Sequence, residues 1–257
     1  MLSSLNSNNT FKISFLIAVF HFLLAMLLWS YYMTMKTSPG KVPAFWGLYI
    51  DDDDNKRRRF CVICRVCKPR RSHHCGRCNC CILNMHYHCV WVDNCIGFYN
   101  RKFYMILLFY FCCIILFFDF SAFYYVFLYI KEYFTYGKKY EYQLRTLFVT
   151  ICYIIILVFT YLFIRLYKKN LTLVLNNSTN VEILDKNPYN LMYRLSYIEN
   201  WRQVFGFNPL LWFIPLALES GKSDGEMEST GKLFLLMKSK LMIFSKIRQK
   251  CNFFIKK

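Results

Sequence analysis

Nine cysteines and four histidines lie within residues 61–95, and side chains of both types are zinc ligands. Two Cys-x2-Cys pairs each supply two thiolates at once, and a closed tetrahedral site needs four ligands. The spacing therefore predicts two interleaved zinc sites. One site takes Cys61, Cys64, His74 and Cys81, and the other takes Cys75, Cys78, His88 and Cys95.

Disulfide bonds are the alternative for such a cysteine-rich segment, and they require an oxidising compartment. Histidines at ligand spacing favour zinc, as does the topology below, which places the segment in the reducing cytosol. A loop with few apolar residues gains its folding energy from the metal, so we expect both ions to be structural. Cys67 and Cys80 lie one to three positions from assigned ligands and are spare or alternative ligands.

Cys89 also remains outside both sets, and its surroundings differ from those of the other spare cysteines. It directly follows the ligand His88, and His86 and Tyr87 precede it. A thiolate held beside a metal-bound imidazole, with cationic side chains nearby, can have a lowered pKa, which a nucleophilic cysteine requires. Cys89 is therefore the candidate nucleophile.

The cysteine-rich segment carries a longer pattern of fixed spacings. Its positions are Cys61, Cys64, Lys68-Pro69, Ser72-His73-His74-Cys75, Cys78, Cys81, His86-Tyr87-His88-Cys89, Trp91, Asn94-Cys95-Ile96-Gly97 and Asn100. This pattern resembles the cysteine-rich domain of the DHHC-type protein S-acyltransferases, the palmitoyltransferases. The resemblance implies the same zinc partition and makes Cys89 the residue that carries the acyl group. It also implies that two later segments, Thr179–Glu182 and Asn200–Gly206 with Trp212 and Pro215, pack near the active site.

The chain departs from the family at the motif that names it, where Asp-His-His-Cys is replaced by His86-Tyr87-His88-Cys89. The family's base histidine is Tyr87 here, and its orienting aspartate is His86. Tyrosine is a poor base at neutral pH because its unperturbed pKa is about 10. His86, with an unperturbed pKa of about 6.5, takes the proton if it reaches Cys89, and otherwise it is a bystander. The candidate catalytic residues are Cys89, His86 and Tyr87.

The composition indicates a small polytopic membrane protein, since the 257 residues are 56% hydrophobic and 20% aromatic with a net charge of +18. Three apolar runs are long enough to cross a bilayer as helices. We expect an all-α polytopic membrane protein with a small zinc-bound cytosolic domain between transmembrane helices. The expected parts are a polar tail at 1–12, spans at 13–34, 103–130 and 146–164, the cysteine-rich domain at 35–102, and a C-terminal tail at 165–257.

The distribution of Lys and Arg predicts the orientation. Thirteen lie in residues 35–102 and fourteen from 168 onward, but only four lie in the short polar loop predicted at 131–145. The positive-inside rule therefore places the cysteine-rich domain and the C-terminal tail in the cytosol. The family normally has two spans before this domain, so either the start of the sequence is incomplete or the family's first helix is missing.

Two basic segments are expected to bind lipids or phosphates. Residues 232–257 interleave apolar and basic side chains like a helix that lies on anionic lipid. The arginines at 57–59, with Lys68, Arg70 and Arg71, either form a solvated flank or attract the phosphates of an acyl-CoA.

The predicted function is that of an S-acyltransferase. It moves a fatty acyl group from palmitoyl-CoA or another long-chain acyl-CoA to Cys89, and then to cysteines of substrate proteins near the bilayer. The expected cofactors are two structural zinc ions, and the expected partners are membrane lipids, acyl-CoA and cytosolic or membrane proteins. The expected location is an endomembrane, Golgi or ER, or the plasma membrane. The alternative is a weakly active or inactive membrane scaffold of the same family. Nucleic acid is not expected, because spans on both sides tether the zinc module to lipid.

Overall fold

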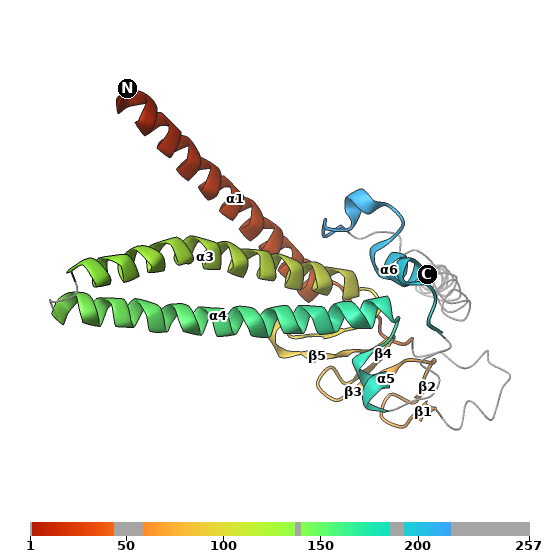
Figure 1. Cartoon of the computed structure of the whole chain (residues 1–257). Helices are drawn as coiled ribbons and strands as arrows, with labels where there is room; N and C mark the ends of the chain where they lie inside the picture. Colours follow the sequence, from red (N-terminus) through yellow and green to blue (C-terminus); the bar gives the residue numbers. More distant parts are fainter. Residues whose placement is uncertain (1, 44–58, 137–139, 186–192, 217–257) are drawn as a thin grey trace, which may run out of the picture.

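Three long helices dominate the computed structural model, which describes residues 2–43, 59–136, 140–185 and 193–216 (Figure 1). They are α1 (Leu2–Lys36), α3 (Arg101–Tyr136) and α4 (Tyr140–Leu175). Segments of all three, Thr10–Lys36, Arg101–Thr135 and Leu144–Leu175, are long and apolar enough to span a membrane. Helices α3 and α4 lie side by side, whereas α1 diverges from them toward its N-terminus.

The predicted architecture, apolar helices with a cysteine-rich domain between them, is therefore confirmed. The helices are longer than the apolar runs. Helix α1 includes most of the predicted polar tail, and only three residues separate α3 from α4 where a loop over 131–145 was expected. Extending an existing helix adds one hydrogen bond per residue fixed, and no glycine or proline lies between Arg101 and Tyr136 to stop it.

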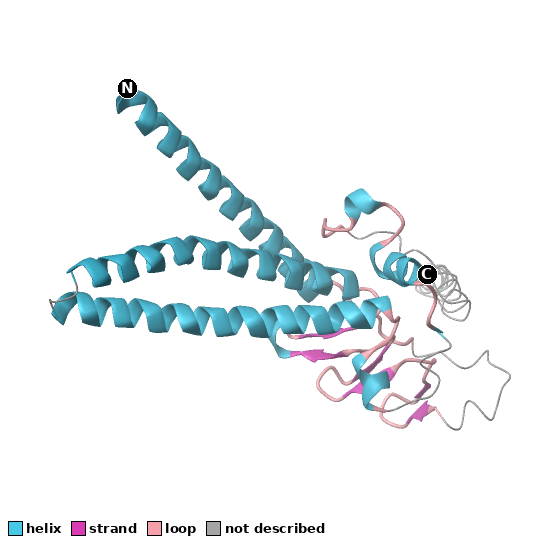
Figure 2. Cartoon of the chain, viewed as in Figure 1, coloured by secondary structure: helices cyan, strands magenta, loops and turns pink. Residues whose placement is uncertain are grey.

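The cysteine-rich domain consists of short antiparallel hairpins and lies at the end of α4 where α5 follows (Figure 2). A 3-10 turn, η1 (Val90–Val92), connects the strands of the last hairpin. Isolated two-stranded hairpins are marginally stable at best, so this domain needs other support. The strand pairs are β1 (Phe60–Cys61) with β2 (Val66–Cys67), β3 (His73–Cys75) with β4 (Cys80–Ile82), and β5 (Tyr87–Cys89) with β6 (Asn94–Ile96).

Three short helical elements follow α4: α5 (Asn180–Leu184), α6 (Tyr197–Phe205) and the 3-10 turn η3 (Pro209–Leu211). Thr179 and Ser196 begin α5 and α6 with capping boxes, in which side chain and backbone of the N-cap and N3 residues bond reciprocally. The C-terminal tail predicted from residue 165 begins within α4, because this helix continues to Leu175. The expected lipid-binding helix at 232–257 lies outside the described residues, as do residues 57 and 58 of the arginine run.

Two asparagines attach the cysteine-rich domain to the end of α1. The amide nitrogen of Asn94 lies 3.0 to 3.3 Å from the carbonyl oxygens of Thr34, Met35 and Thr37. Asn100, fully buried, accepts a hydrogen bond from Gly97 N at 2.9 Å and donates to the Cys95 carbonyl at 2.8 Å and to the carbonyl of Thr34 on α1 at 3.4 Å. The last carbonyls of a helix have no partner within it, so Asn94 satisfies groups that burial would otherwise leave unpaired. These bonds fix the domain relative to α1.

Candidate metal centres and active site

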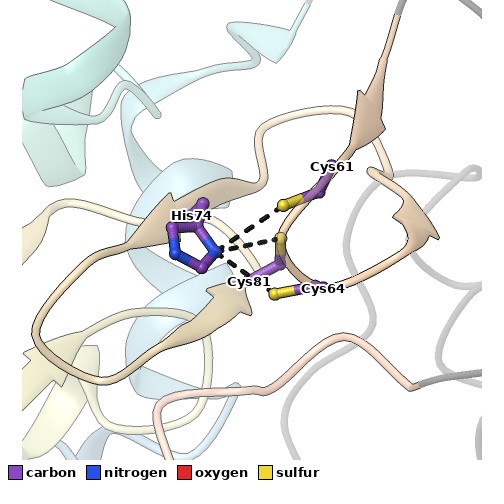
Figure 3. A group of neighbouring side chains, drawn as sticks. All are labelled: Cys61, Cys64, His74 and Cys81. Carbon is purple, nitrogen blue, oxygen red and sulfur yellow. Dashed lines mark hydrogen bonds between the residues drawn. The ribbon is translucent and has the colours of Figure 1, made fainter.

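The first candidate metal-binding group is Cys61, Cys64, His74 and Cys81, the set assigned from the spacing. Figure 3 shows the three sulfurs around Nδ1 of His74, at distances of 3.6 Å for Cys61, 3.2 Å for Cys64 and 4.0 Å for Cys81. Tetrahedral zinc with bonds of about 2.3 Å to sulfur and about 2.0 Å to nitrogen separates such ligand atoms by about 3.5 Å. The group therefore fits a zinc ion.

The second group is Cys75, Cys78, His88 and Cys95, again the predicted set. Nδ1 of His88 lies 3.8 Å from Cys75 Sγ, 3.3 Å from Cys78 Sγ and 3.7 Å from Cys95 Sγ. The sulfurs of Cys78 and Cys95 are 3.5 Å apart, far beyond the disulfide bond length of about 2.05 Å. No disulfide bond joins cysteines within the described residues, so the structure does not support the disulfide alternative.

The interleaving of the two groups follows from strand geometry. Successive side chains of a strand point to opposite faces, so the neighbours His74 and Cys75 on β3 serve different groups. The strand register then places Cys81 opposite His74 and Cys95 opposite His88. Each metal would connect two hairpins, and β3 would connect the two metals. Two bound ions would in this way turn three marginal hairpins into one cross-linked unit.

Cys89 belongs to neither group and lies instead where the cysteine-rich domain meets the membrane helices. It is buried in a cluster with Val92, Ile96, Tyr104 and Leu108, and the last two belong to α3. Leu166 and Tyr167 of α4 pack against the same cluster. A single strand, β5, thus carries His88, a candidate metal ligand, and the Cys89 thiol that packs against both helices. Cys67 and Cys80 likewise lie outside both groups.

Tyr87 is on the same side of β5 as Cys89, because the two residues are two positions apart. Its hydroxyl donates a hydrogen bond to the hydroxyl of Tyr104 on α3, and the two rings meet edge to face. Burial raises the pKa of Tyr87, and the neighbouring Tyr104 raises it further. The phenol therefore keeps its proton at neutral pH and acts as a donor. Sequence reasoning did not find Tyr104, because nothing in the spacing pairs it with Tyr87.

His86 has different surroundings. It is 3% exposed, its backbone nitrogen donates to the carbonyl of Ile96 at 2.8 Å, and its Nε2 is buried without a hydrogen-bond partner. Burial lowers the pKa of His86 well below its ordinary value, and the positive charges of Arg101 and Arg71 lower it further. The imidazole is therefore neutral, and the charged groups that act on it are these two arginines rather than Cys89.

The position of Arg71 in a basic run suggested that it attracts the phosphates of an acyl-CoA, but the structure gives it other partners. Its side chain is 5% exposed and bonded to Glu182 and Asn177, so it is not available to attract the phosphates of a solvent-side ligand. Lys102 is similarly engaged, since its ammonium donates to the carbonyls of Leu211 and Leu216 at 2.9 and 3.3 Å. The partners of Arg71 and of Lys102 all lie more than a hundred positions further along the chain, so local sequence spacing does not predict these contacts.

Comparison with known proteins gives consistent matches. The chain is 32% identical over 223 residues to probable protein S-acyltransferase 13 of Arabidopsis thaliana, covering 80% of this chain and 73% of that protein. It is 34% identical over 172 residues to palmitoyltransferase ZDHHC15 of Xenopus laevis, covering 63% and 48%. It is 28% identical over 247 residues to human palmitoyltransferase ZDHHC20, covering 82% and 65%.

The match to the family as a whole covers the same region as the site. The model of the DHHC palmitoyltransferase family matches residues 54–187, which include both metal-binding groups, Cys89, helices α3 and α4, and Glu182. This region is more than half of the 257 residues. The chain therefore belongs to the DHHC palmitoyltransferase family.

Proposed function

We propose that this protein is a membrane-bound protein S-acyltransferase that uses Cys89 as its nucleophile. The observation that carries the proposal is the position of Cys89, which is outside both metal-binding groups and packed against α3 and α4. A metal-bound thiolate is occupied as a ligand, whereas a free thiol next to a ligand histidine is available for covalent catalysis. The names of the relatives above support the same reaction.

The reaction takes two steps. The sulfur of Cys89 attacks the thioester carbonyl of a long-chain acyl-CoA such as palmitoyl-CoA. The new carbon–sulfur bond forms as the bond to coenzyme A breaks, and coenzyme A leaves with the proton of the Cys89 thiol. A cysteine thiol of a substrate protein then attacks the acyl-enzyme, and its proton returns to Cys89. Each step exchanges one thioester for another, so catalysis consists mainly of positioning and thiol activation.

Two zinc ions would be held by Cys61, Cys64, His74 and Cys81 and by Cys75, Cys78, His88 and Cys95. Bound there, they supply cross-links that order the domain. In this proposal the chain's own residues position the reactive thiol: β5 fixes Cys89, and the hydroxyl pair of Tyr87 and Tyr104 attaches β5 to α3.

The membrane places the reaction at the boundary between water and lipid. Trp91 and Val90 are 88% and 67% exposed beside Cys89, and the hydroxyl of Tyr31 on α1 donates to the Trp91 carbonyl. Tyr31 lies five residues before the end of α1 at Lys36, about 7.5 Å along the helix axis. Tryptophan is enriched at membrane interfaces. We propose that this side faces the cytosol of a Golgi, ER or plasma membrane, and that substrate cysteines lie close to the bilayer.

The direct test is acyl-enzyme formation by the purified full-length protein in lipid nanodiscs. Incubation with palmitoyl-CoA is expected to release coenzyme A and add the mass of one palmitoyl group to the peptide that contains Cys89. Hydroxylamine, which cleaves thioesters, is expected to remove it. If the protein contains two zinc ions but the peptide gains no acyl group, the protein is the inactive scaffold of the family instead.

His86 is proposed to support the position of β5 without accepting the proton of Cys89. The substitution His86→Asn keeps a small polar side chain and is expected to lower the rate of acyl-enzyme formation less than about tenfold, since removing a general base typically costs 10² to 10⁴. The pH dependence of the rate is expected to keep its shape. Two changes in the His86→Asn variant would together show that His86 is the base: a loss of rate greater than tenfold, and the disappearance of the rise in the pH–rate profile near the pKa of an imidazole.

A further inference from the structure

The side chain of Arg71 extends from the cysteine-rich domain and contacts the segment that follows α4. Its Nε donates to Glu182 Oε1 at 2.6 Å, and its Nη2 donates to Glu182 Oε2 at 3.1 Å. Its Nη1 and Nη2 also donate to the side-chain and backbone oxygens of Asn177, at 3.0 and 2.7 Å. The guanidinium lies 4.7 Å from the ring centre of Tyr193. Such a two-point contact between guanidinium and carboxylate fixes orientation as well as distance.

The partners of Arg71 are held in place by bonds of their own. Glu182 Oε2 accepts a hydrogen bond from the Thr179 backbone at 2.7 Å, which completes the capping box of α5. Asn177 donates to the Tyr193 carbonyl and to Gln203 of α6, both at 2.8 Å. Arg71, Asn177 and Glu182 are all less than 8% exposed. Arg71 therefore binds buried acceptor groups whose positions are already fixed by other hydrogen bonds, and not an exposed surface carboxylate.

The backbone of Arg71 connects this contact to the nucleophile. Its carbonyl accepts a hydrogen bond from the Met85 backbone at 3.2 Å, and the next residue, His86, bonds to Ile96 of β6. Cys89 is four positions beyond Met85 on β5. Arg71 itself has a φ of +60°, in the left-handed region that a residue with a side chain adopts only when its surroundings require it.

We propose that Arg71 is a positioning residue for Cys89, which acts by binding Glu182 and Asn177 and so holds the cysteine-rich domain against the end of α4. The two metal-binding groups order the domain internally, but their ligands all lie within residues 61–95. The contact of Arg71 joins this domain to a segment 106 to 111 residues later. It thereby sets where β5 meets the membrane helices. This inference rests on the proposed function of Cys89.

The substitution Glu182→Gln tests the proposal most cleanly. Glutamine retains an oxygen for the capping box of α5 but removes the charge that binds Arg71. The matched control is Glu199→Gln, because Glu199 occupies the same capping-box position in α6 but is solvent-exposed. Both variants are expected to retain two zinc ions. Glu182→Gln is expected to lower the rate of acyl-enzyme formation from palmitoyl-CoA by about 10- to 100-fold, since a displacement of about 1 Å has that effect. Glu199→Gln is expected to match the wild type.

A second measurement separates positioning from folding. Alkylation of Cys89 by iodoacetamide, followed by mass spectrometry of its peptide, does not require the helices to be correctly placed. It is expected to be faster in Glu182→Gln than in Glu199→Gln, because the thiol becomes less buried. Arg71→Lys, which keeps the charge but not the two-point contact, is expected to fall between the wild type and Arg71→Met in its rate of acylation.

The outcomes are distinct. An acylation rate in Glu182→Gln within twofold of Glu199→Gln overturns the proposal, and so does a loss of zinc in step with the loss of rate. If the wild type itself forms no acyl-enzyme, the proposed function fails. The alkylation rates then still decide whether Arg71 and Glu182 position Cys89, and equal rates in the two variants reject it.

Discussion

Replacing Cys89 with serine is expected to abolish acyl-enzyme formation while both metal-binding groups keep their ions. Serine differs by a single atom, and the sulfur of Cys89 is in neither group, so the hairpins keep their cross-links. A hydroxyl is a far weaker nucleophile than a thiol without a strong base. Here Tyr87 is a protonated phenol, and burial and the charges of Arg101 and Arg71 lower the pKa of His86. We expect the rate to fall by at least about 10³-fold, as for other enzymes that lose their nucleophile.

The measurement is thioester labelling with an alkyne analogue of palmitoyl-CoA, read before and after hydroxylamine and normalised to zinc content. Cys67→Ser is the control, since Cys67 is a partly exposed cysteine of the same domain and belongs to neither group. It is expected to retain the label. Label that persists in Cys89→Ser would place the acyl group on another cysteine. Loss of label in Cys67→Ser as well would point to damage of the domain instead of loss of a nucleophile.

Removal of a metal ligand is expected to have an effect of similar size by a different route. The substitution His74→Ala leaves three sulfurs of the first group without their fourth ligand. Zinc at such sites contributes about 10 to 16 kcal/mol of apparent binding energy, which in small domains is folding energy. The hairpins have little core of their own, so we expect the first site to lose its ion, residues 59–82 to unfold, and acylation to fall to background.

The neighbouring residue provides the control. His73 precedes His74 on β3 and belongs to neither group, so His73→Gln is expected to keep two zinc ions per chain and most of the activity. Zinc is measured by inductively coupled plasma mass spectrometry, and folding by limited proteolysis of the domain. A His74→Ala protein that still holds two zinc ions would require another ligand in its place. A protein that lost one ion but kept its activity would show that the first site is not needed to hold Cys89.

The sequence by itself predicted the two sets of candidate ligands and the helical architecture. The eight side chains assigned from spacing are the same eight that the fold gathers into two groups, because ligand pairs close in sequence leave few ways to complete a tetrahedron. Hydropathy likewise indicated the three apolar helices, since only a helix satisfies its own backbone hydrogen bonds in lipid. The helices extend beyond the predicted spans, because composition does not show how far a helix continues past its apolar part.

Only the tertiary structure decided the surroundings of the Cys89 thiol. Spacing placed His86 near Cys89 in the chain, yet the fold buries its imidazole, and burial together with the charges of Arg101 and Arg71 lowers its pKa. Arg71 was grouped with surface cations, yet it binds Glu182, 111 positions away. In the sequence, Tyr104 is one of many aromatic residues in an apolar run, but in the fold its hydroxyl accepts a hydrogen bond from Tyr87. The physical reason is the same in each case. These contacts join segments that come together only when the domain packs on α3 and α4, so local sequence patterns do not predict which side chains will be in contact.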